Sequence, residues 1–197
     1  MLACPALRAA SFAVLGLLFA TGPVLAQQGP VPAPKTTTKS AAKPAKATGP
    51  KAIGKFEDWT AATNKEVGQT VCYAFTRAQA SAPAVSGRGD VVLTVTERPG
   101  GPAARDAVAI SAGFAYAANA PVTVNVDQAT LEFYTAQRSA FARDGHAAAQ
   151  AFLKARQAVA HSPGPKGAAV ADTFSLKGFA AAYAAINKAC PPGKSAS

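Results

Sequence analysis

The chain has 197 residues, of which 49% are hydrophobic, and a formal net charge of +10. This length and composition fit one domain with a hydrophobic core. The excess charge lies largely in six lysines that precede Phe56, whereas the segment from Phe56 to Pro192 has 12 basic and 10 acidic residues. A nucleic-acid-binding protein gathers its basic residues on a folded face, so this distribution argues against that class.

The first 26 residues have the pattern of a secretory signal peptide. A basic start ending at Arg8 precedes an apolar run over residues 9–25, which closes on Val24-Leu25-Ala26. The run is shorter than the about 20 residues that span a bilayer, and Pro23 interrupts its end, so cleavage is favoured over a membrane anchor. We therefore expect an exported protein, located in the periplasm or associated with the outer membrane.

Residues 27–52 are predicted to be a disordered linker, because proline, lysine and alanine alternate there without apolar periodicity. Two functions for it remain open. It can act as a spacer, or as an electrostatic tether to anionic lipid headgroups, lipopolysaccharide or wall polymers, giving at most peripheral membrane contact. Charge screening limits the reach of such a tether to about 8 Å at physiological salt. The candidate tether residues are Lys35, Lys39, Lys43, Lys46, Lys51 and Lys55.

The folded domain is expected over residues 53–192, followed by a disordered tail at 193–197. Apolar residues that alternate with period two, together with β-branched runs, predict a series of strands. In the first of these strands, Val71, Tyr73 and Phe75 lie on one face and Cys72 on the other. Asp127-Gln128 is placed as a tight turn between two strands. The predicted strands cover residues 67–76, 91–96, 106–112, 122–126, 130–135 and 168–174.

Two helices are predicted in the C-terminal third. Residues 146–159 are rich in alanine and place apolar residues at helical spacing, and Ser175 is predicted to cap a final helix that ends at Ala189. The segment Ser162–Gly167 is expected to be a loop. The predicted fold is therefore mainly β, an antiparallel sandwich or open barrel, with a mid-chain helix and a C-terminal helix packed on it.

Two cysteines, Cys72 and Cys190, remain after the signal peptide is removed. An even number of cysteines in an oxidising compartment predicts a disulfide bond. Its loop of over a hundred residues would give it on the order of 4 to 5 kcal/mol of loop entropy. Because no Cys-x-x-Cys spacing or nearby histidine is present, we predict no redox site, metal or cofactor.

Four segments together resemble the invasion-associated locus B protein family. They are Phe56-Glu57-Asp58-Trp59, Val71-Cys72-Tyr73, Arg98-Pro99-Gly100 and the block from Asp172 to Phe179 that precedes Cys190. The resemblance covers about residues 54–190 and implies an exported bacterial protein with a β-rich domain, linked to host-cell entry in some pathogens. It carries over no catalytic residues. Compared with the family, the basic tail is long and only one cysteine pair is present.

Candidate catalytic residues are few. The chain has two histidines, His146 and His161, and a set of Ser175, His161 and Asp172 has no supporting Gly-x-Ser-x-Gly turn. Arg88-Gly89-Asp90 matches an integrin-binding tripeptide, but a turn before a strand explains the same residues.

We therefore predict a non-enzymatic envelope protein that binds a protein or an anionic envelope polymer. The alternative is a periplasmic hydrolase with an unrecognised site, which would show a pocket of convergent polar groups with perturbed protonation. Five aromatic residues are candidates to line a binding groove, although core packing explains them equally well: Phe114, Tyr116, Phe133, Tyr134 and Phe141.

Overall fold

The computed structural model describes residues 49–100 and 104–193. The predicted signal peptide, all but the last residues of the predicted linker, and residues 194–197 lie outside the described residues. Four of the six candidate tether lysines, Lys35 to Lys46, lie there too.

The described residues form one antiparallel sheet with the strand order β1-β2-β3-β5-β6-β9-β8-β7-β10-β11-β4. Two α-helices accompany it, α1 at Gly145–Phe152 and α2 at Phe179–Ala189. The strands are β1 Lys51–Phe56, β2 Trp59–Glu66, β3 Gln69–Arg77, β4 Ala80–Ala82, β5 Val92–Glu97, β6 Ala107–Ser111, β7 Val122–Val126, β8 Ala129–Ala136, β9 Ser139–Ala142, β10 Gln157–Pro163 and β11 Ala169–Ser175.

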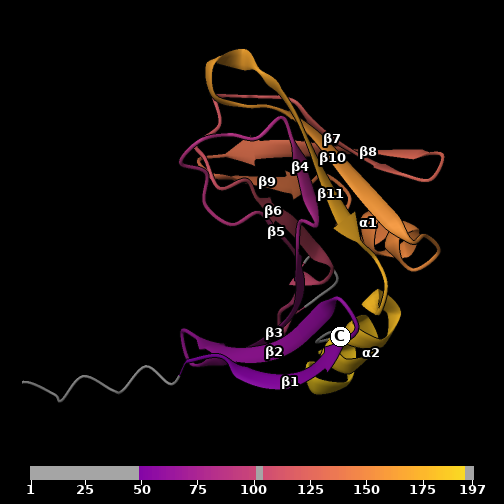
Figure 1. Cartoon of the computed structure of the whole chain (residues 1–197). Helices are drawn as coiled ribbons and strands as arrows, with labels where there is room; N and C mark the ends of the chain where they lie inside the picture. The colour runs from indigo at the N-terminus through magenta and orange to yellow at the C-terminus, as the bar shows by residue number, and fades with distance from the viewer. Residues whose placement is uncertain (1–48, 101–103, 194–197) are drawn as a thin grey trace, which may run out of the picture. The chain divides into compact units, whose positions relative to one another are not determined.

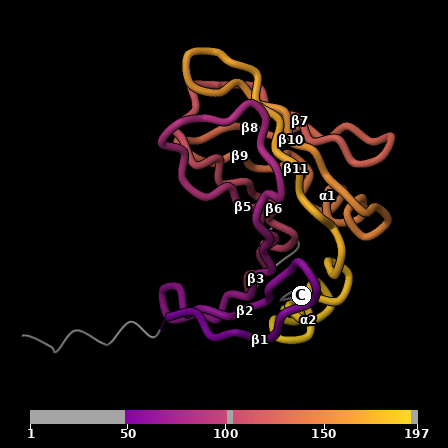
Figure 2. The backbone as a smooth tube through the Cα atoms, in the orientation of Figure 1, coloured from indigo at the N-terminus to yellow at the C-terminus, as the bar shows by residue number. Residues whose placement is uncertain are grey.

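The sheet curves back on itself without closing. β4 lies at one edge of the sheet beside β11, yet in the chain it directly follows β3, the third strand from the other edge. A backbone hydrogen bond of 2.8 Å from the amide of Gln79 to the carbonyl of Thr173 joins the two regions. Figures 1 and 2 show β1, β2 and β3 with α2 at one end, and β7 to β11 with α1 at the other. The prediction of a mainly β fold with two helices is confirmed, with the sheet as an open barrel.

One hydrophobic core connects both helices to the sheet. Phe179 of α2 contacts Trp59 of β2 with ring centroids 4.8 Å apart, and Phe152 of α1 at 5.6 Å. The indole nitrogen of Trp59 donates a hydrogen bond of 2.9 Å to the carbonyl of Ser175. These buried contacts fix α2 against the strands on which the candidate site depends.

Most predicted strands are confirmed within a few residues, and β7 has the predicted bounds. The prediction of a long mid-chain helix is wrong in its second half, because α1 ends at Phe152 and residues 157–163 form β10. In β10 the residues Ala158, Ala160 and Ser162 are buried alternately, so the period there is two. The strand also extends into the segment that was predicted to be a loop.

The start of the final helix is also different from the prediction. Ser175 ends β11, and the N-cap of α2 is Gly178, with φ of 84°. A Cβ at Gly178 would lie 2.0 Å from the carbonyl oxygen of Phe56. Glycine is therefore required here both by backbone conformation and by close approach to β1.

The folded sheet begins slightly earlier than predicted. β1 starts at Lys51, so the last residues of the predicted linker, and Lys55 as well, lie in a strand. In β3 the residues Cys72 and Ala74 are buried and Tyr73 and Phe75 only partly buried, as the alternation predicts, but Val71, on the face of Tyr73, is buried as well. β3 therefore presents its aromatic residues on the face away from the core.

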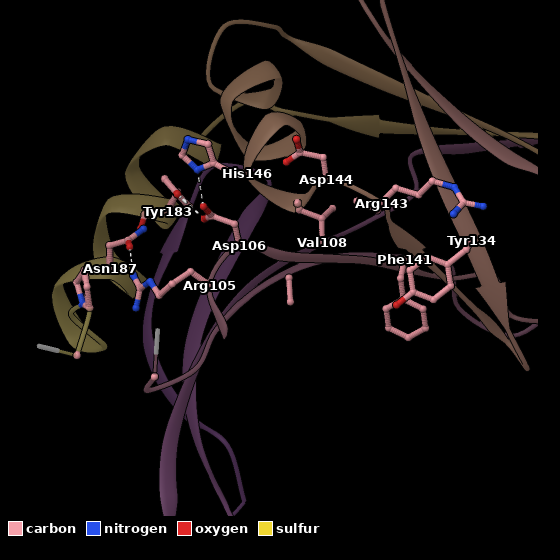
Figure 3. Close-up of a pocket in the computed structure, with 16 residues that line it drawn as sticks. Arg105, Asp106, Val108, Tyr134, Phe141, Arg143, Asp144, His146, Tyr183 and Asn187 are labelled. Atoms are coloured by element: carbon pink, nitrogen blue, oxygen red, sulfur yellow. Dashed lines mark hydrogen bonds and ion pairs between the residues drawn. The ribbon is translucent and has the colours of Figure 1, made fainter. Parts of the chain in front are cut away.

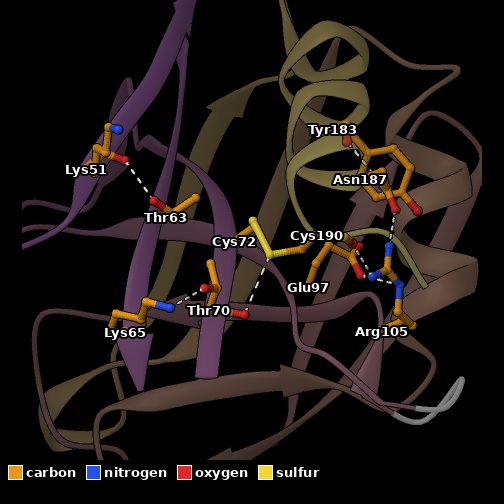
Figure 4. The surroundings of a disulfide bond; sticks show 10 residues. All are labelled: Lys51, Thr63, Lys65, Thr70, Cys72, Glu97, Arg105, Tyr183, Asn187 and Cys190. Carbon is orange, nitrogen blue, oxygen red and sulfur yellow. Dashed lines mark hydrogen bonds and ion pairs between the residues drawn. A yellow bond between two sulfur atoms is a disulfide. The ribbon is translucent and has the colours of Figure 1, made fainter. Parts of the chain in front are cut away.

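The predicted disulfide is confirmed. Cys72 of β3 and Cys190, which follows α2, are bonded with their Cα atoms 5.9 Å apart, across a separation of 118 residues (Figure 4). The bond attaches the end of the C-terminal helix to the third strand of the sheet.

Candidate functional site

A cavity of about 780 Å³, which we call the first cavity, lies where the start of β6, the end of β9 and the two helices meet (Figure 3). Asp106 and Ala107 come from the start of β6, and His146 from the first turn of α1. The other lining residues are Gly100, Arg105, Val108, Tyr134, Phe141, Ala142, Arg143, Asp144, Gly145, Tyr183, Asn187, Pro192 and Gly193.

Asp106 joins both helices on one side of this cavity. Its Oδ2 lies 2.7 Å from Nδ1 of His146, and its Oδ1 accepts a hydrogen bond of 2.5 Å from the hydroxyl of Tyr183. Its backbone has φ of 51°, an uncommon conformation for a residue other than glycine. The amide of Asp106 donates a long hydrogen bond, 3.4 Å, to Oε2 of Glu97. One carboxylate thus fixes the positions of α1 and α2 relative to β6.

Arg105 extends this network to the disulfide (Figure 4). Its Nε lies 2.8 Å from Oε2 of Glu97, which is fully buried, and its guanidinium donates a bond of 2.6 Å to the carbonyl of Cys190. It also donates to the side chain of Asn187. Because its donors are already engaged, Arg105 supports the cavity wall more than it offers charge to a ligand.

The protonation of this cluster is perturbed. Burial and the neighbouring Asp106 raise the pKa of Glu97 to about 7, although Arg105 opposes the shift. For Asp106, burial favours a higher pKa, but hydrogen bonds from Tyr183 and His146 outweigh it and lower the pKa. The hydrogen bond to Asp106 raises the pKa of His146, and burial raises the pKa of Tyr183. The imidazole is therefore more readily cationic than a free histidine, and the phenol stays protonated.

The other side of the first cavity presents aromatic rings and a cation. Tyr134 of β8 is 48% exposed and stacks on Phe141 of β9, with ring centroids 5.5 Å apart. The Arg143 side chain is 63% exposed, and its Nε lies 3.7 Å from a carboxylate oxygen of Glu132. An ion pair this long and this exposed is weak. Arg143 is therefore available to an anionic group on a ligand.

The described lining of the first cavity has a limited set of reactive side chains. None of the sixteen residues that line the first cavity is a serine, threonine, cysteine or lysine. The side chain of His146 is 71% exposed and paired to a carboxylate, as in a general base. The cavity thus meets the criterion of convergent polar groups with perturbed protonation, and its charged and titratable lining side chains are carboxylates, an imidazole, phenols and guanidinium groups.

The catalytic set considered from the sequence does not assemble. Asp172 is buried in an ion pair with Arg88, with both N–O distances 2.7 Å. His161 pairs across the ladder with Ala171, so its side chain lies on the opposite face of the sheet from that of Asp172. The same ion pair argues against integrin binding by Arg88-Gly89-Asp90. The side chain of Arg88 is only 6% exposed, so it is not accessible to a receptor.

The aromatic residues predicted to line a groove divide into two groups. Phe114 and Phe133 are buried, and Tyr116 packs edge-on against Phe114 at 5.2 Å. Tyr134 and Phe141 do line the first cavity.

Asp106 and Tyr183, which line one side of the first cavity, were not predicted as site residues from the sequence. A signal was present in β5, where Leu93, Val95 and Glu97 alternate on the buried face, so a carboxylate sits at a core position. Glu97 therefore needed a buried partner, which is Arg105.

Over the described ranges no helix is long and apolar enough to cross a membrane. Within the same ranges, no three or more His, Cys, Asp or Glu side chains are grouped to hold a metal ion.

Comparison with known proteins identifies the family. A crystal structure of invasion associated protein B from Bartonella henselae is similar, with a TM-score of 0.50 and 15% identity, covering 69% of this chain and 95% of that chain. At this identity the likeness shows the fold alone. No curated protein matches the chain. The model of the Invasion associated locus B (IalB) protein family matches residues 59–187, which include β2 to β11 and most of α2. The chain therefore belongs to the IalB family.

Proposed function

We propose that this chain is an exported, non-enzymatic cell-envelope protein that binds a protein or an anionic envelope polymer in the first cavity. The family description links IalB proteins to invasion, so the proposal includes a supporting part in host-cell entry. The predicted signal peptide supports export to the periplasm or the outer membrane.

One observation carries the proposal. The first cavity combines a stacked aromatic pair, Tyr134 and Phe141, with the exposed guanidinium of Arg143 and the exposed imidazole of His146, whose pKa is raised. Aromatic faces bind rings and apolar groups, and the cations bind carboxylate or phosphate oxygens. Because rings and charges of this kind suit a ligand with both ring faces and acidic groups, binding is the function that this combination supports best.

The basic N-terminal segment supports a second contact with the envelope. Lys51 and Lys55 are exposed on β1, and together with Lys35, Lys39, Lys43 and Lys46 they would attract an anionic surface. Contacts of exposed charges are weakened by salt, whereas the stacking of a ligand on Tyr134 and Phe141 does not depend on charge.

Envelope fractionation tests both contacts. Mature protein, a variant lacking residues 27–48, and the double variant Tyr134→Ala/Arg143→Gln would each be mixed with envelopes and washed at low and high salt. We expect the double variant to lose the salt-resistant association and the truncated variant to lose the salt-sensitive part.

Arg77→Gln is the matched control, because Arg77 is 66% exposed in a pair with Asp90 and does not line the first cavity. Salt-resistant association that persists in the double variant would overturn the assignment of the cavity.

The pair of Asp106 and His146 supports a second candidate, a hydrolase. In the neutral imidazole, Asp106 accepts a hydrogen bond from the N–H at Nδ1 of His146, which leaves Nε2 able to take a proton from water. Incubation of the protein with isolated envelope polymer would release soluble fragments if this candidate is correct. His146→Gln should then abolish the release, and no release from the wild-type protein would exclude the candidate for that substrate.

A further inference from the structure

A second cavity, of about 600 Å³, lies on the sheet face that points away from the core. Its floor includes Tyr73 and Phe75, whose ring centroids are 6.0 Å apart, and three threonines from β2 and β5. The lining residues are Pro50, Ala52, Thr60, Ala62, Asn64, Glu66, Tyr73, Phe75, Val92, Thr94, Thr96 and Arg98.

The two cavities adjoin on the face of the sheet that carries Ala107, Phe141 and Tyr134, which form one side of the first cavity. Thr96 lines the second cavity, and its ladder partner Ala107 lines the first. Directly paired residues on neighbouring strands share a face and lie about 5 Å apart. The cavities therefore meet at the β5–β6 pair.

A row of paired residues crosses this face from one cavity to the other. The ladders pair Thr60 with Phe75, Phe75 with Thr94, and Thr94 with Ala109. They continue from Ala109 to Phe141 and from Phe141 to Tyr134. With strands about 4.8 Å apart, the row from β2 to β8 follows about 24 Å of sheet surface.

The row begins at Thr60 and then has an aromatic ring at Phe75, small or hydroxylic residues at Thr94 and Ala109, and two aromatic rings at its β8 end. Phe75 and the Tyr134–Phe141 stack provide ring faces, and Thr94 provides a partly exposed hydroxyl. Arg143, and His146 when it is protonated, add positive charge at the first cavity, and Arg98, 45% exposed and paired with Glu66, lies at the second. Sugar rings stack on aromatic faces, and their hydroxyls bond to polar side chains.

We infer that the two cavities form one groove for an extended acidic polysaccharide, which crosses the strands and places carboxylates at Arg143 and His146. The inference depends on the proposed function, since it names the ligand class of the first cavity. A peptide added as a strand would need a free sheet edge, whereas this row crosses the sheet on its face. A lipid chain would need a continuous apolar surface, which the threonines interrupt.

Binding of oligosaccharides of defined length tests the inference. The probes are a galacturonate disaccharide and a long oligogalacturonate, with neutral malto-oligosaccharides of matched length, measured by calorimetry on the mature protein. We expect the long acidic probe to bind about tenfold tighter than the disaccharide or more, because it occupies both cavities. The neutral probes should bind more weakly, and Arg143→Gln should reduce that difference.

Variants in the second cavity give the sharper result. Phe75→Ala should weaken binding of the long probe and leave the disaccharide unchanged, whereas Tyr134→Ala should weaken both. Phe75→Leu keeps apolar bulk without a ring and replaces Phe75→Ala if that variant does not fold. Val67→Ala, at a fully exposed residue outside both cavities, is the matched control and should change neither affinity.

Equal affinity for the two acidic probes, or no effect at Phe75, would overturn the extended groove. If no oligosaccharide binds while envelope association still requires Tyr134 and Arg143, the polysaccharide inference fails and a protein partner in the first cavity stands. If envelope association is independent of Tyr134 and Arg143, the proposed function itself fails.

Discussion

Glu97 couples the protonation of the first cavity to the stability of the fold. Its side chain is fully buried, and its Oε1 has no hydrogen-bond partner among the described residues. The pKa of Glu97 is raised from 4.5 to about 7, so between these values the folded state binds more protons than the unfolded state. Stability from this group is thus complete below about pH 4.5 and is lost as the pH rises towards 7.

We predict that Glu97→Gln removes this pH dependence, because glutamine stays neutral. The free energy of unfolding of the wild-type protein should fall by about 1 to 3 kcal/mol between pH 4.5 and 7.5, and that of the variant should change less. His146 contributes in the same direction, since its pKa is also raised, so His146→Gln serves as the comparison. Urea denaturation across this range measures both, and parallel curves for wild type and Glu97→Gln would refute the assignment.

Arg88 and Asp172 form the ion pair that removes the tripeptide motif from the surface. Arg88 also donates a bond of 2.6 Å to the carbonyl of Ala112, and its guanidinium lies 4.9 Å from the ring centre of Phe114. The hydroxyl of Ser81 donates to Asp172 at 2.6 Å. Both side chains of the pair therefore have at least one further interaction with a neighbouring residue.

We predict that Asp172→Asn destabilises the protein by about 3 to 5 kcal/mol, because it leaves the guanidinium of Arg88 buried without a counter-charge. The control is Asp90→Asn, which breaks the exposed pair with Arg77 and should cost less than about 1 kcal/mol. Thermal unfolding of both variants gives the comparison. Similar losses of stability in the two variants would contradict the prediction that the burial of Arg88 makes removal of its counter-charge costly.

At the scale of elements, the connection from β11 to α2 has a strict requirement for glycine. Gly178 has φ of 84° and leaves no space for a Cβ beside the carbonyl of Phe56. We predict that Gly178→Ala destabilises the protein by more than about 2 kcal/mol, because it adds a steric clash to backbone strain.

Gly167→Ala separates the cost of backbone strain from the cost of the steric clash. Gly167 has φ of 78° with open space around its Cβ position, so its substitution should cost only the strain of about 1 to 2 kcal/mol. Equal losses at the two glycines, measured by chemical denaturation, would show that contact with β1 does not matter.

The elements also show how much of the fold the sequence predicts. β7 was predicted with its observed bounds because valines alternate with polar residues over Val122–Val126, between Pro121 and Asp127. This signal is purely local. β10 was missed because alanine fits helix and strand periods equally, and its pairing with β7 and β11 is a long-range property.

The candidate site was predicted less completely than the fold. Tyr134 and Phe141 were named as groove candidates, and the disulfide followed from compartment and cysteine count. The network around Asp106 was not predicted, because its members come from β5, β6, α1 and α2 and meet only after the sheet has curved.

At the scale of the whole molecule, the first cavity exists only while α2 remains attached to the sheet. The helix is held by Phe179 in the core, by the hydrogen bond from Tyr183 to Asp106, and by the disulfide that follows its last turn. All three contacts link residues that are far apart in the chain, with Tyr183 and Asp106 77 residues apart and the two cysteines 118 apart, and of the three the disulfide is covalent. In the chain-entropy model a loop of that length gives about 4 to 5 kcal/mol.

We predict that Cys72→Ala/Cys190→Ala loses about that much stability and, with α2 released more often, loses salt-resistant envelope association as well. Reduced wild-type protein should behave in the same way, and the oxidised mature protein should contain no free thiol. Hydrogen exchange should show faster exchange in α2 than in β7, since β7 lies in the sheet at a distance from the disulfide in strand order. Intact association in a destabilised double variant would mean that ligand binding does not need α2, and would place the binding groove on the sheet face alone.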